Sequence, residues 1–231
     1  MKRLKEVSPV SVNMDLRMLK SAFGTARRRK LIDSNHFGGI SLADVPQKAP
    51  SFLTVEEFQT LIECIKDGWL KEVVLFAVLT GMRQDEILNL KWEDVDLGKR
   101  LVHIQSSPSF KTKQGRRRTI PPSESALYLL SAKAEKTTSE YVFTLIARFL
   151  KGSWVTHLFK RYVRRAGIQN DRLRFHSLRH TFASRLVQSG ATLYEVQRLL
   201  GHSSSKVTEI YSHLQPEHLH DTVNRIEIPL N

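Results

Sequence analysis

The stretch HSLRHTFASRLVQSGATLYEVQRLLGHSSSKVTEIY, which runs from His176 to Tyr211, decides how the C-terminal part of this chain folds. Its apolar residues recur at helical spacing, and a glycine stands just beyond two of the periodic runs, at Gly190 and Gly201. A glycine in that position favours the left-handed backbone that ends many helices. The stretch therefore predicts three successive helices, over residues 177–188, 193–200 and 205–213.

The same stretch carries four reactive side chains. His176 and Arg179 stand three positions apart in HSLRH. His202 follows in LLGHSS, and Tyr211 lies nine residues further on. A guanidinium pairs with phosphate oxygens, and a phenol beside a base is a nucleophile. Together with two imidazoles they form a set that can hold a phosphodiester and attack it.

Composition narrows the class of partner. The chain has 231 residues, 41% of them hydrophobic, which is enough for one good core and a small second unit. Its formal net charge is +13 and its pI is about 10.0. Such an excess of cations favours a polyanionic partner, and nucleic acid is the usual one. A basic protein with no such partner is the alternative that charge alone leaves open.

Cysteine content and hydropathy bear on location. The single Cys64 excludes an internal disulfide framework, and its place in an apolar helical run favours a buried structural thiol. No apolar stretch approaches the roughly 18–20 residues that a membrane span requires. The basic N-terminus MKRLKEVSPV lacks the apolar region of a signal peptide. We expect no membrane association and a cytoplasmic location for a bacterial or phage protein, with a nucleus left open.

Residues 11–32 predict an N-terminal helix that ends in a run of four cations. Positive charge suits the C-terminal end of a helix and could also meet phosphate, while a solvated basic face explains the run equally well. Residues 35–50 carry glycine and proline breaks and predict a linker. The cations are Arg27, Arg28, Arg29 and Lys30.

The main domain opens on a capping box, in which the Thr54 oxygen accepts from the Glu57 amide while Glu57 reaches back. The next helix is expected to stop at Gly81, and a short helix from Arg83 would place Glu86 on the same face. Strand-forming residues recur twice, separated by a basic connection. The prediction is a mainly α fold with one small antiparallel β-sheet (α+β). Helices are expected over 69–80, 83–90, 124–136 and 153–166, and strands over 100–105 and 117–120.

Five ordered boxes resemble those of the tyrosine recombinase (phage integrase) family. They are TGMRQDEIL, FKTKQGRRRTIP, FHSLRHTFASRL, LLGHSS and VTEIYSHL, and the resemblance covers residues 50–214. Five boxes in order are far more specific than any one of them. The resemblance implies the catalytic-domain fold of the DNA breaking-rejoining enzymes. It also implies site roles: Arg83 and Arg179 as the arginine pair, Lys113 on the hairpin, His176 and His202 as the histidines, Tyr211 as nucleophile, and Glu86 as support for Arg83.

These roles fit the chemistry of the residue types. Two guanidinium groups can clamp the phosphate and stabilise its transition state. Tyr211, with a reference pKa near 10, needs a base, and His176 is the natural acceptor. His202 can bond a phosphate oxygen or aid the proton transfer. Lys113 is the preferred general acid for the leaving 5′-oxygen, with Lys111 as its rival. The 3′-phosphotyrosine product stores the bond energy, so neither ATP nor a metal ion is expected as cofactor.

A zinc site is the alternative for part of this set. His176 and His180 stand four apart on an expected helix, as two zinc ligands do in H-E-x-x-H. Ser177 occupies the glutamate position, however, and Arg179 would repel a dication. We therefore expect no metal, and we expect His180 to hydrogen-bond within the core.

The resemblance also sets the domain division and the partners. Residues 1–47 are expected to be a partial helical core-binding (SAM-like) domain with its linker, and residues 48–231 the catalytic domain. A trimmed chain, a fragment and a natural short form all fit the short N-terminal part. The implied partner is double-stranded DNA. The protein is expected to form a homo-tetramer on synapsed DNA and to be a monomer, or only weakly associated, when free of DNA. Candidate contacts to the DNA backbone are Arg27, Arg28, Arg29, Lys30, Lys111, Arg116, Arg117 and Arg118.

Three functions compete on this evidence. The first is site-specific recombination, with DNA integration or excision by a metal- and ATP-independent strand transferase. The second is a type IB topoisomerase, which uses the same residue types to relax supercoils as a monomer. The third is a DNA-binding protein that keeps the fold without catalysis. The sequence favours the first and leaves open the DNA target, the kind of mobile genetic element, and a role in chromosome-dimer resolution.

Overall fold

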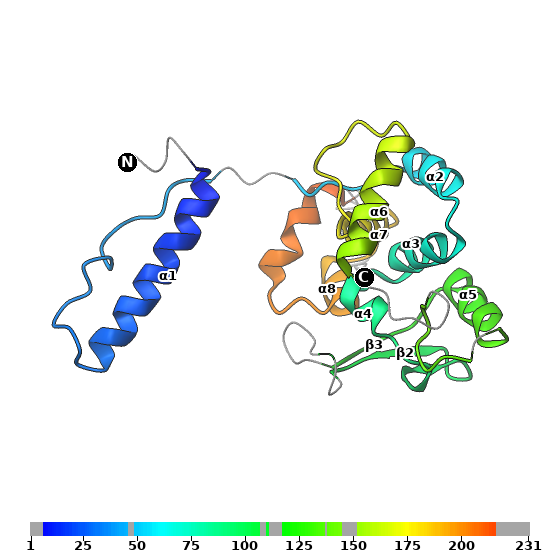
Figure 1. The fold of residues 1–231 in the computed structure, drawn as a ribbon, viewed down its shortest axis with the longest axis horizontal. Helices are drawn as coiled ribbons and strands as arrows, with labels where there is room; N and C mark the ends of the chain where they lie inside the picture. Colours follow the sequence, from blue (N-terminus) through cyan, green and yellow to red (C-terminus); the bar gives the residue numbers. More distant parts are fainter. Residues whose placement is uncertain are drawn as a thin grey trace, which may run out of the picture. The chain divides into compact units, whose positions relative to one another are not determined.

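The computed structural model describes residues 7–45, 49–106, 110, 117–136, 138–144 and 152–215. The chain divides into two compact units, residues 1–49 and residues 50–231. Figure 1 draws both units with the element labels used below. Within the described residues, no helix is both long enough and apolar enough to cross a membrane.

The N-terminal unit is one long helix with an extended segment packed along it. Helix α1 (Pro9–Arg28) begins at Ser8, whose side chain accepts from the backbone of the first turn. The Asn13 side chain exchanges two hydrogen bonds of 2.8 Å with the backbone of Ala43. The rings of Phe23 and Phe37 meet edge to face, 4.7 Å apart. Most of the segment expected as a linker therefore belongs to this unit.

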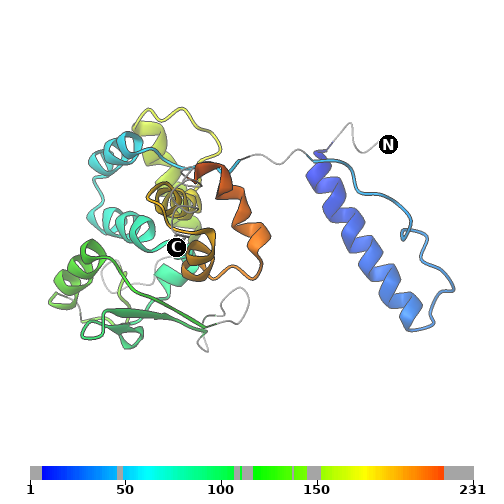
Figure 2. The same ribbon diagram turned by 180° about the vertical axis from the view of Figure 1, so that it is seen from behind.

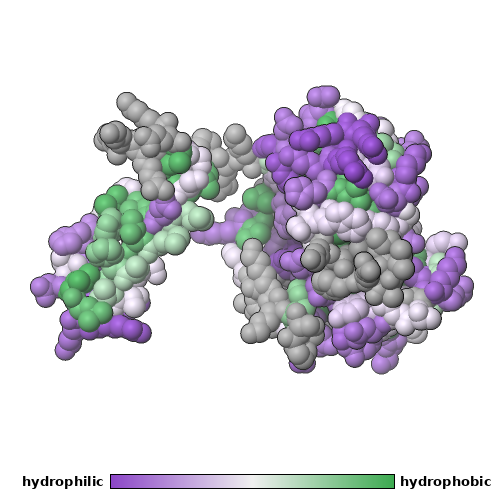
Figure 3. Space-filling model, viewed as in Figure 1, coloured by the Kyte–Doolittle hydropathy of each residue, from purple (hydrophilic) through white to green (hydrophobic). Residues whose placement is uncertain are grey.

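Helix α1 ends four residues before the predicted end. Lys30 takes a left-handed backbone with a φ of 58°, and the Leu31 amide donates to the carbonyl of Ala26. This turn stops the helix within the run of cations. One face of α1 stays uncovered in the unit: Val10, Met14 and Met18 are 58%, 59% and 63% exposed, and Figure 3 shows apolar surface along this helix.

The C-terminal unit is mainly helical, as predicted. Figures 1 and 2 show its helices beside one small sheet. Helix α3 lies at the centre of the core and packs against both α5 and α7. The α-helices are α2 (Val55–Cys64), α3 (Gly68–Thr80), α4 (Gln84–Leu88), α5 (Glu124–Ala134), α6 (Gly152–Arg165), α7 (Ser177–Gln188) and α8 (Leu193–Leu200). The described 3₁₀ helices include η2 (Trp92–Asp94), η3 (Ser205–Val207) and η4 (Glu209–Leu214).

The sheet has three antiparallel strands in the order β1 (Val95–Asp96), β2 (Leu101–Ile104) and β3 (Arg118–Ile120). Val102 of β2 faces Ile120 of β3, and both side chains are buried. The two predicted strands are present. Strand β1 was not predicted, because two residues are too few to show an alternating pattern.

Helix ends follow the predicted chemistry in most places. Thr54 and Glu57 form the reciprocal capping box, with bonds of 3.2 and 2.9 Å. Gly81, Gly190 and Gly201 all have positive φ. The helix expected over 205–213 is instead the pair of short 3₁₀ helices η3 and η4. They part at Thr208, whose hydroxyl is engaged by His202 at 2.8 Å.

Candidate active site

A tight turn at the end of α3 presents Arg83. Gly81 ends the helix in the left-handed region with a φ of 63°, and α4 begins three residues later, at Gln84. The Arg83 backbone amide and its guanidinium both donate to the carboxylate of Glu86, at 2.8 and 2.9 Å. The two side chains are thus paired one helical turn apart, as their spacing predicted.

Glu86 also binds a second arginine. Its side chain is 1% exposed, and Arg118 of strand β3 donates to both of its oxygens, at 2.8 and 2.6 Å. Burial by itself raises the pKa of the Glu86 carboxyl, but the hydrogen bonds and positive charges of Arg118 and Arg83 outweigh it and hold the pKa at about 2. Two cations share one anion, so one positive charge remains in excess.

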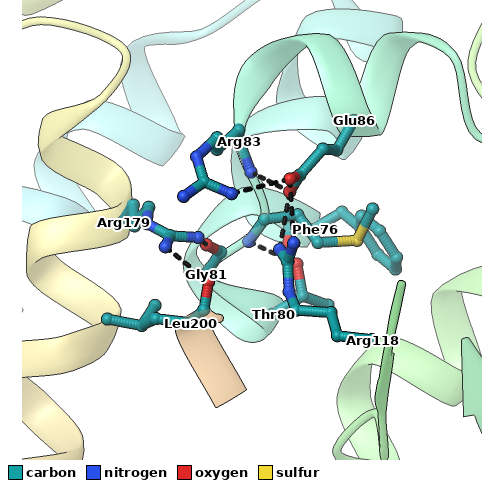
Figure 4. Close-up of polar contacts among 9 residues, drawn as sticks. Phe76, Thr80, Gly81, Arg83, Glu86, Arg118, Arg179 and Leu200 are labelled. Atoms are coloured by element: carbon teal, nitrogen blue, oxygen red, sulfur yellow. Dashed lines mark hydrogen bonds and ion pairs between the residues drawn. The ribbon is translucent and has the colours of Figure 1, made fainter. Parts of the chain in front are cut away.

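Arg179 lies deep in the same region. It stands in the first turn of α7 and is 3% exposed. Its guanidinium donates to the backbone carbonyls of Gly81 and Leu200, at 2.7 and 2.6 Å. Burial, and then repulsion from Arg83 and Arg118, lowers the pKa of Arg179 to about 9. Figure 4 shows these groups around the α3–α4 turn. Arg179 is still a cation at pH 7.

His202 stands directly behind the glycine that ends α8. Its Nδ1 lies 2.8 Å from the hydroxyl of Thr208, in a half-buried position. Burial lowers the pKa of His202 to about 4, and repulsion from Arg179 and Arg83 adds to the effect. His202 is therefore neutral at pH 7.

Tyr211 is almost fully enclosed. It lies in η4, is 1% exposed, and packs in a small core with Val187, Val196 and Leu200. Its hydroxyl lies 2.5 Å from Nδ1 of His180. Burial raises the pKa of Tyr211 to about 12, against an opposing attraction from Arg179. The phenol is thus neutral at pH 7 and turned away from solvent in this arrangement.

His180 is the residue that the sequence did not connect to Tyr211. An internal hydrogen bond for His180 was expected, and its partner is the proposed nucleophile itself. His176, the expected proton acceptor, is exposed, and its ring meets His180 edge to face with centroids 5.0 Å apart. The pairing joins residues 31 positions apart, so no local spacing could reveal it. The HSLRH motif does place both histidines on one helical face.

The remaining candidates fall in three groups. Lys111, Lys113 and Arg116 lie outside the described residues. Arg118 faces Glu86 with its side chain only 11% exposed, which does not fit the surface contact to a DNA backbone that was expected of it. The others are exposed: Arg117 before strand β3, and Arg27, Arg28, Arg29 and Lys30 at the end of α1.

The described part of the chain contains no group of three or more His, Cys, Asp or Glu side chains that could hold a metal ion. His176 and His180, the pair with zinc-ligand spacing, instead form a chain of ring contacts that ends at Tyr211.

Comparison with known proteins places this geometry in a family. The family model described as "Phage integrase family" matches residues 51–218. "Tyrosine recombinase XerA" of Pyrococcus furiosus is 32% identical over 192 residues, covering 80% of this chain and 64% of that protein. The chain therefore spans less than two thirds of the length of this curated relative.

Two solved structures share the fold. The Tn1549 transposon integrase (residues 82–397, R225K), in complex with a circular intermediate DNA, matches with a TM-score of 0.79 and 20% identity, covering 97% of this chain and 82% of that one. A lambda integrase tetramer bound to a Holliday junction matches with a TM-score of 0.71 and 24% identity, covering 87% and 61%. With the family model spanning most of its length, the chain belongs to the phage integrase family of tyrosine recombinases.

Proposed function

We propose that this chain is a site-specific DNA strand transferase that cuts and rejoins DNA through Tyr211, in integration or excision. The observation that carries the proposal is the convergence of four residues. Arg179 donates to the carbonyls of Gly81 and Leu200, which stand two positions before Arg83 and His202, and Tyr211 packs in one small core with Leu200. Family membership supports it. One structural relative is a transposon integrase in complex with a circular intermediate DNA, and another is bound to a Holliday junction; we propose substrates of these kinds for this chain.

The arginines form the proposed phosphate clamp. Each guanidinium carries five N–H donors, and the two hydrogen bonds of Arg179 to backbone carbonyls hold it without using them all. Attack on the phosphate adds negative charge to its non-bridging oxygens, and fixed cations stabilise that charge most in the transition state. Loss of one such donor typically costs roughly 2.7–4 kcal/mol in activation free energy.

In the proposed chemical step, the Tyr211 oxygen bonds to phosphorus while the bond from phosphorus to the 5′-oxygen breaks. The phenol proton passes to a histidine. The family resemblance gives this role to His176, while in the structure the hydroxyl of Tyr211 is hydrogen-bonded to His180. The leaving 5′-oxygen takes a proton from Lys113, with Lys111 as the alternative. Rejoining reverses the phosphoryl transfer and both proton transfers, so the cycle needs neither ATP nor a metal ion.

The buried phenol adds a requirement. With a pKa of about 12, about one Tyr211 in 10⁵ is ionised at pH 7. Attack therefore needs Tyr211 to leave its small core and come within reach of a phosphate held by Arg83 and Arg179. We propose that DNA binding drives this movement of Tyr211, because the bound phosphate supplies a negative charge that pairs with Arg83 and Arg179.

Assembly and domain roles complete the proposal. The partner is double-stranded DNA, and exchange of strands between two duplexes uses four protomers in synapsis, with a monomer or weak oligomer when free. The lambda integrase tetramer on a Holliday junction supports such an assembly. The N-terminal unit acts as a partial core-binding domain, and the C-terminal unit is catalytic. A cytoplasmic location remains the expectation from sequence.

A nicked suicide duplex tests the function. The nick lets the cut strand diffuse away, so the wild-type protein should accumulate a covalent adduct to a 3′ end on a denaturing gel. A randomised pool of duplexes removes the need to know the target. Tyr211→Phe should still shift the DNA in a native gel and yield no adduct. An adduct that persists in Tyr211→Phe would contradict the proposal, as would wild-type protein that binds the pool without forming one.

A further inference from the structure

We propose that Arg118 is a positioning residue of this site, which holds Arg83 through their shared carboxylate and locks strand β3 to the turn that carries His202. The inference rests on the function proposed above and adds a residue to it. Arg118 was expected at the DNA surface, and its geometry assigns it to the interior of the site instead.

The first support is the bonding around Glu86. Oε1 accepts from the guanidinium groups of Arg83 and Arg118, at 2.9 and 2.8 Å. Oε2 accepts from the Arg83 backbone amide and from Arg118, at 2.8 and 2.6 Å. All four donors therefore converge on one enclosed carboxylate, as Figure 4 shows. Loss of Arg118 would leave a buried anion with one partner, and Arg83 would then be drawn further onto it.

The second support is the contact with the His202 turn. A Cβ built on Gly201 would lie 2.7 Å from Cδ of Arg118, so the methylene stem of Arg118 already occupies that space. Gly201 also has a φ of 67°, which a side chain would strain. Arg118 thus packs directly against the residue before His202. Its charge is among those that depress the pKa of His202.

The third support is the place of Arg118 in the chain. It opens strand β3, five residues after Lys113, the proposed general acid. A rigid, planar fork that bridges both oxygens of Glu86 fixes the start of this strand relative to α4. Arg118 thereby connects three parts of the site: the strand that follows Lys113 in the sequence, the turn with Arg83, and the turn with His202.

The experiment compares Arg118→Met and Arg118→Lys with a matched control at Arg100, in the turn before strand β2. Arg100 pairs with Glu124 in an exposed ion pair, 56% and 79% exposed, so Arg100→Met makes the same chemical change away from the site. The rate of adduct formation on a nicked duplex is measured at saturating DNA, alongside the Kd. The pKa of His202 in the free protein is measured by NMR titration.

We expect Arg118→Met to slow adduct formation by about 100-fold, the cost of a roughly 1 Å misplacement, with a Kd that stays within a few-fold of wild type. The pKa of His202 should rise, because a nearby cation is gone. Arg118→Lys should return that pKa toward its wild-type value and leave the rate slow, since lysine restores the charge without the planar fork. Arg100→Met should match wild type in all three measurements.

Each outcome is decisive. Wild-type rates in both Arg118 variants, or a slow rate in Arg100→Met as well, would overturn the positioning role. If the wild type forms no adduct, that result counts against the proposed function alone. An unchanged pKa of His202 in Arg118→Met would overturn the contact between Arg118 and the His202 turn, whether or not the wild type forms an adduct. If Arg118→Met does not fold, the rate of Arg118→Lys relative to wild type decides the question.

Discussion

Two histidines of the proposed site have strongly lowered pKa values, and burial is the main cause for both. His180 and His202 each have a pKa of about 4, with nearby cations adding to the effect. Both are therefore neutral at pH 7. A neutral imidazole can accept the proton of a phenol, which an imidazolium cannot. Burial, with the nearby cations, thus keeps both imidazoles neutral and free of a second proton at pH 7.

This arrangement predicts a loss of stability in acid. The unfolded chain binds protons at His180 and His202 below about pH 6.5, while the folded protein takes them up only near pH 4. The free energy of unfolding should therefore fall as pH falls from about 6.5 to 4. Urea melts at pH 7, 5.5 and 4.5 measure it. His202→Gln should flatten the decline, and the exposed His157→Gln should leave it unchanged. An equal decline in His202→Gln would contradict the explanation.

At the scale of single residues, the sequence indicated the reactive residues better than it indicated their hydrogen-bond partners. The ordered boxes predicted a site made of Arg83, Arg179, His202 and Tyr211, and these residues come from segments that meet around Gly81 and Leu200. They could not show that Tyr211 pairs with His180, or that Arg118 pairs with Glu86. These contacts join residues 31 and 32 positions apart, and they depend on how a strand and a 3₁₀ segment pack on helices.

At the scale of elements, the α3–α4 turn connects the fold to the chemistry. Gly81 ends α3, and its carbonyl accepts a hydrogen bond from Arg179. A Cβ on Gly81 would come within 2.3 Å of the Phe182 ring and 2.9 Å of Leu200. The close approach of α7 and α8 to this turn therefore requires a residue without a side chain.

Gly81→Ala should accordingly destabilise the protein. The left-handed backbone costs roughly 1–2 kcal/mol with a side chain, and overpacking adds about 1–3 kcal/mol. Urea denaturation measures the loss. Gly98→Ala is the matched control, since its Cβ would lie 3.5 Å from the nearest atom, an ordinary contact. A Gly81→Ala protein as stable as the Gly98→Ala protein would show that the turn tolerates a side chain.

Elements with strong local chemistry were predictable, and elements made by packing were not. The capping box at Thr54 and the glycines after α3, α7 and α8 fixed helix ends within a few residues. The segment around Tyr211 read as an α-helix from its apolar spacing. It forms two 3₁₀ helices that part at Thr208, where the hydroxyl contacts His202, and sequence periodicity does not contain this contact.

At the scale of the whole molecule, charge and the two units set the binding properties. The net charge of +13 is spread over both units, and four cations stand together at the end of α1. The N-terminal unit also has the exposed apolar face of Val10, Met14 and Met18, which its own segment does not cover. From sequence, the helix and its basic end were predictable, and the packing of the following segment along it was not.

A quadruple variant should bind DNA more weakly, and its affinity should depend less on salt concentration. The variant replaces Arg27, Arg28, Arg29 and Lys30 by glutamine. Each phosphate contact contributes about 0.9 to the slope of log K against log salt concentration, so four contacts would lower the slope by about 3.6. Filter binding over a salt series measures the slope. Lys99→Gln, an exposed change in the C-terminal unit, should leave it unchanged. An unaltered slope in the quadruple variant would assign the run to a solvated face.

The central claim is that Tyr211, and no other residue, takes the DNA strand. After reaction with a nicked duplex, nuclease digestion and proteolysis leave a nucleotide on the attacked side chain, and tandem mass spectrometry locates it. The claim predicts a 3′-nucleotide on the peptide that contains Tyr211, at the phenol oxygen. A nucleotide on any other residue, or DNA that is cut with no modified peptide, would contradict it.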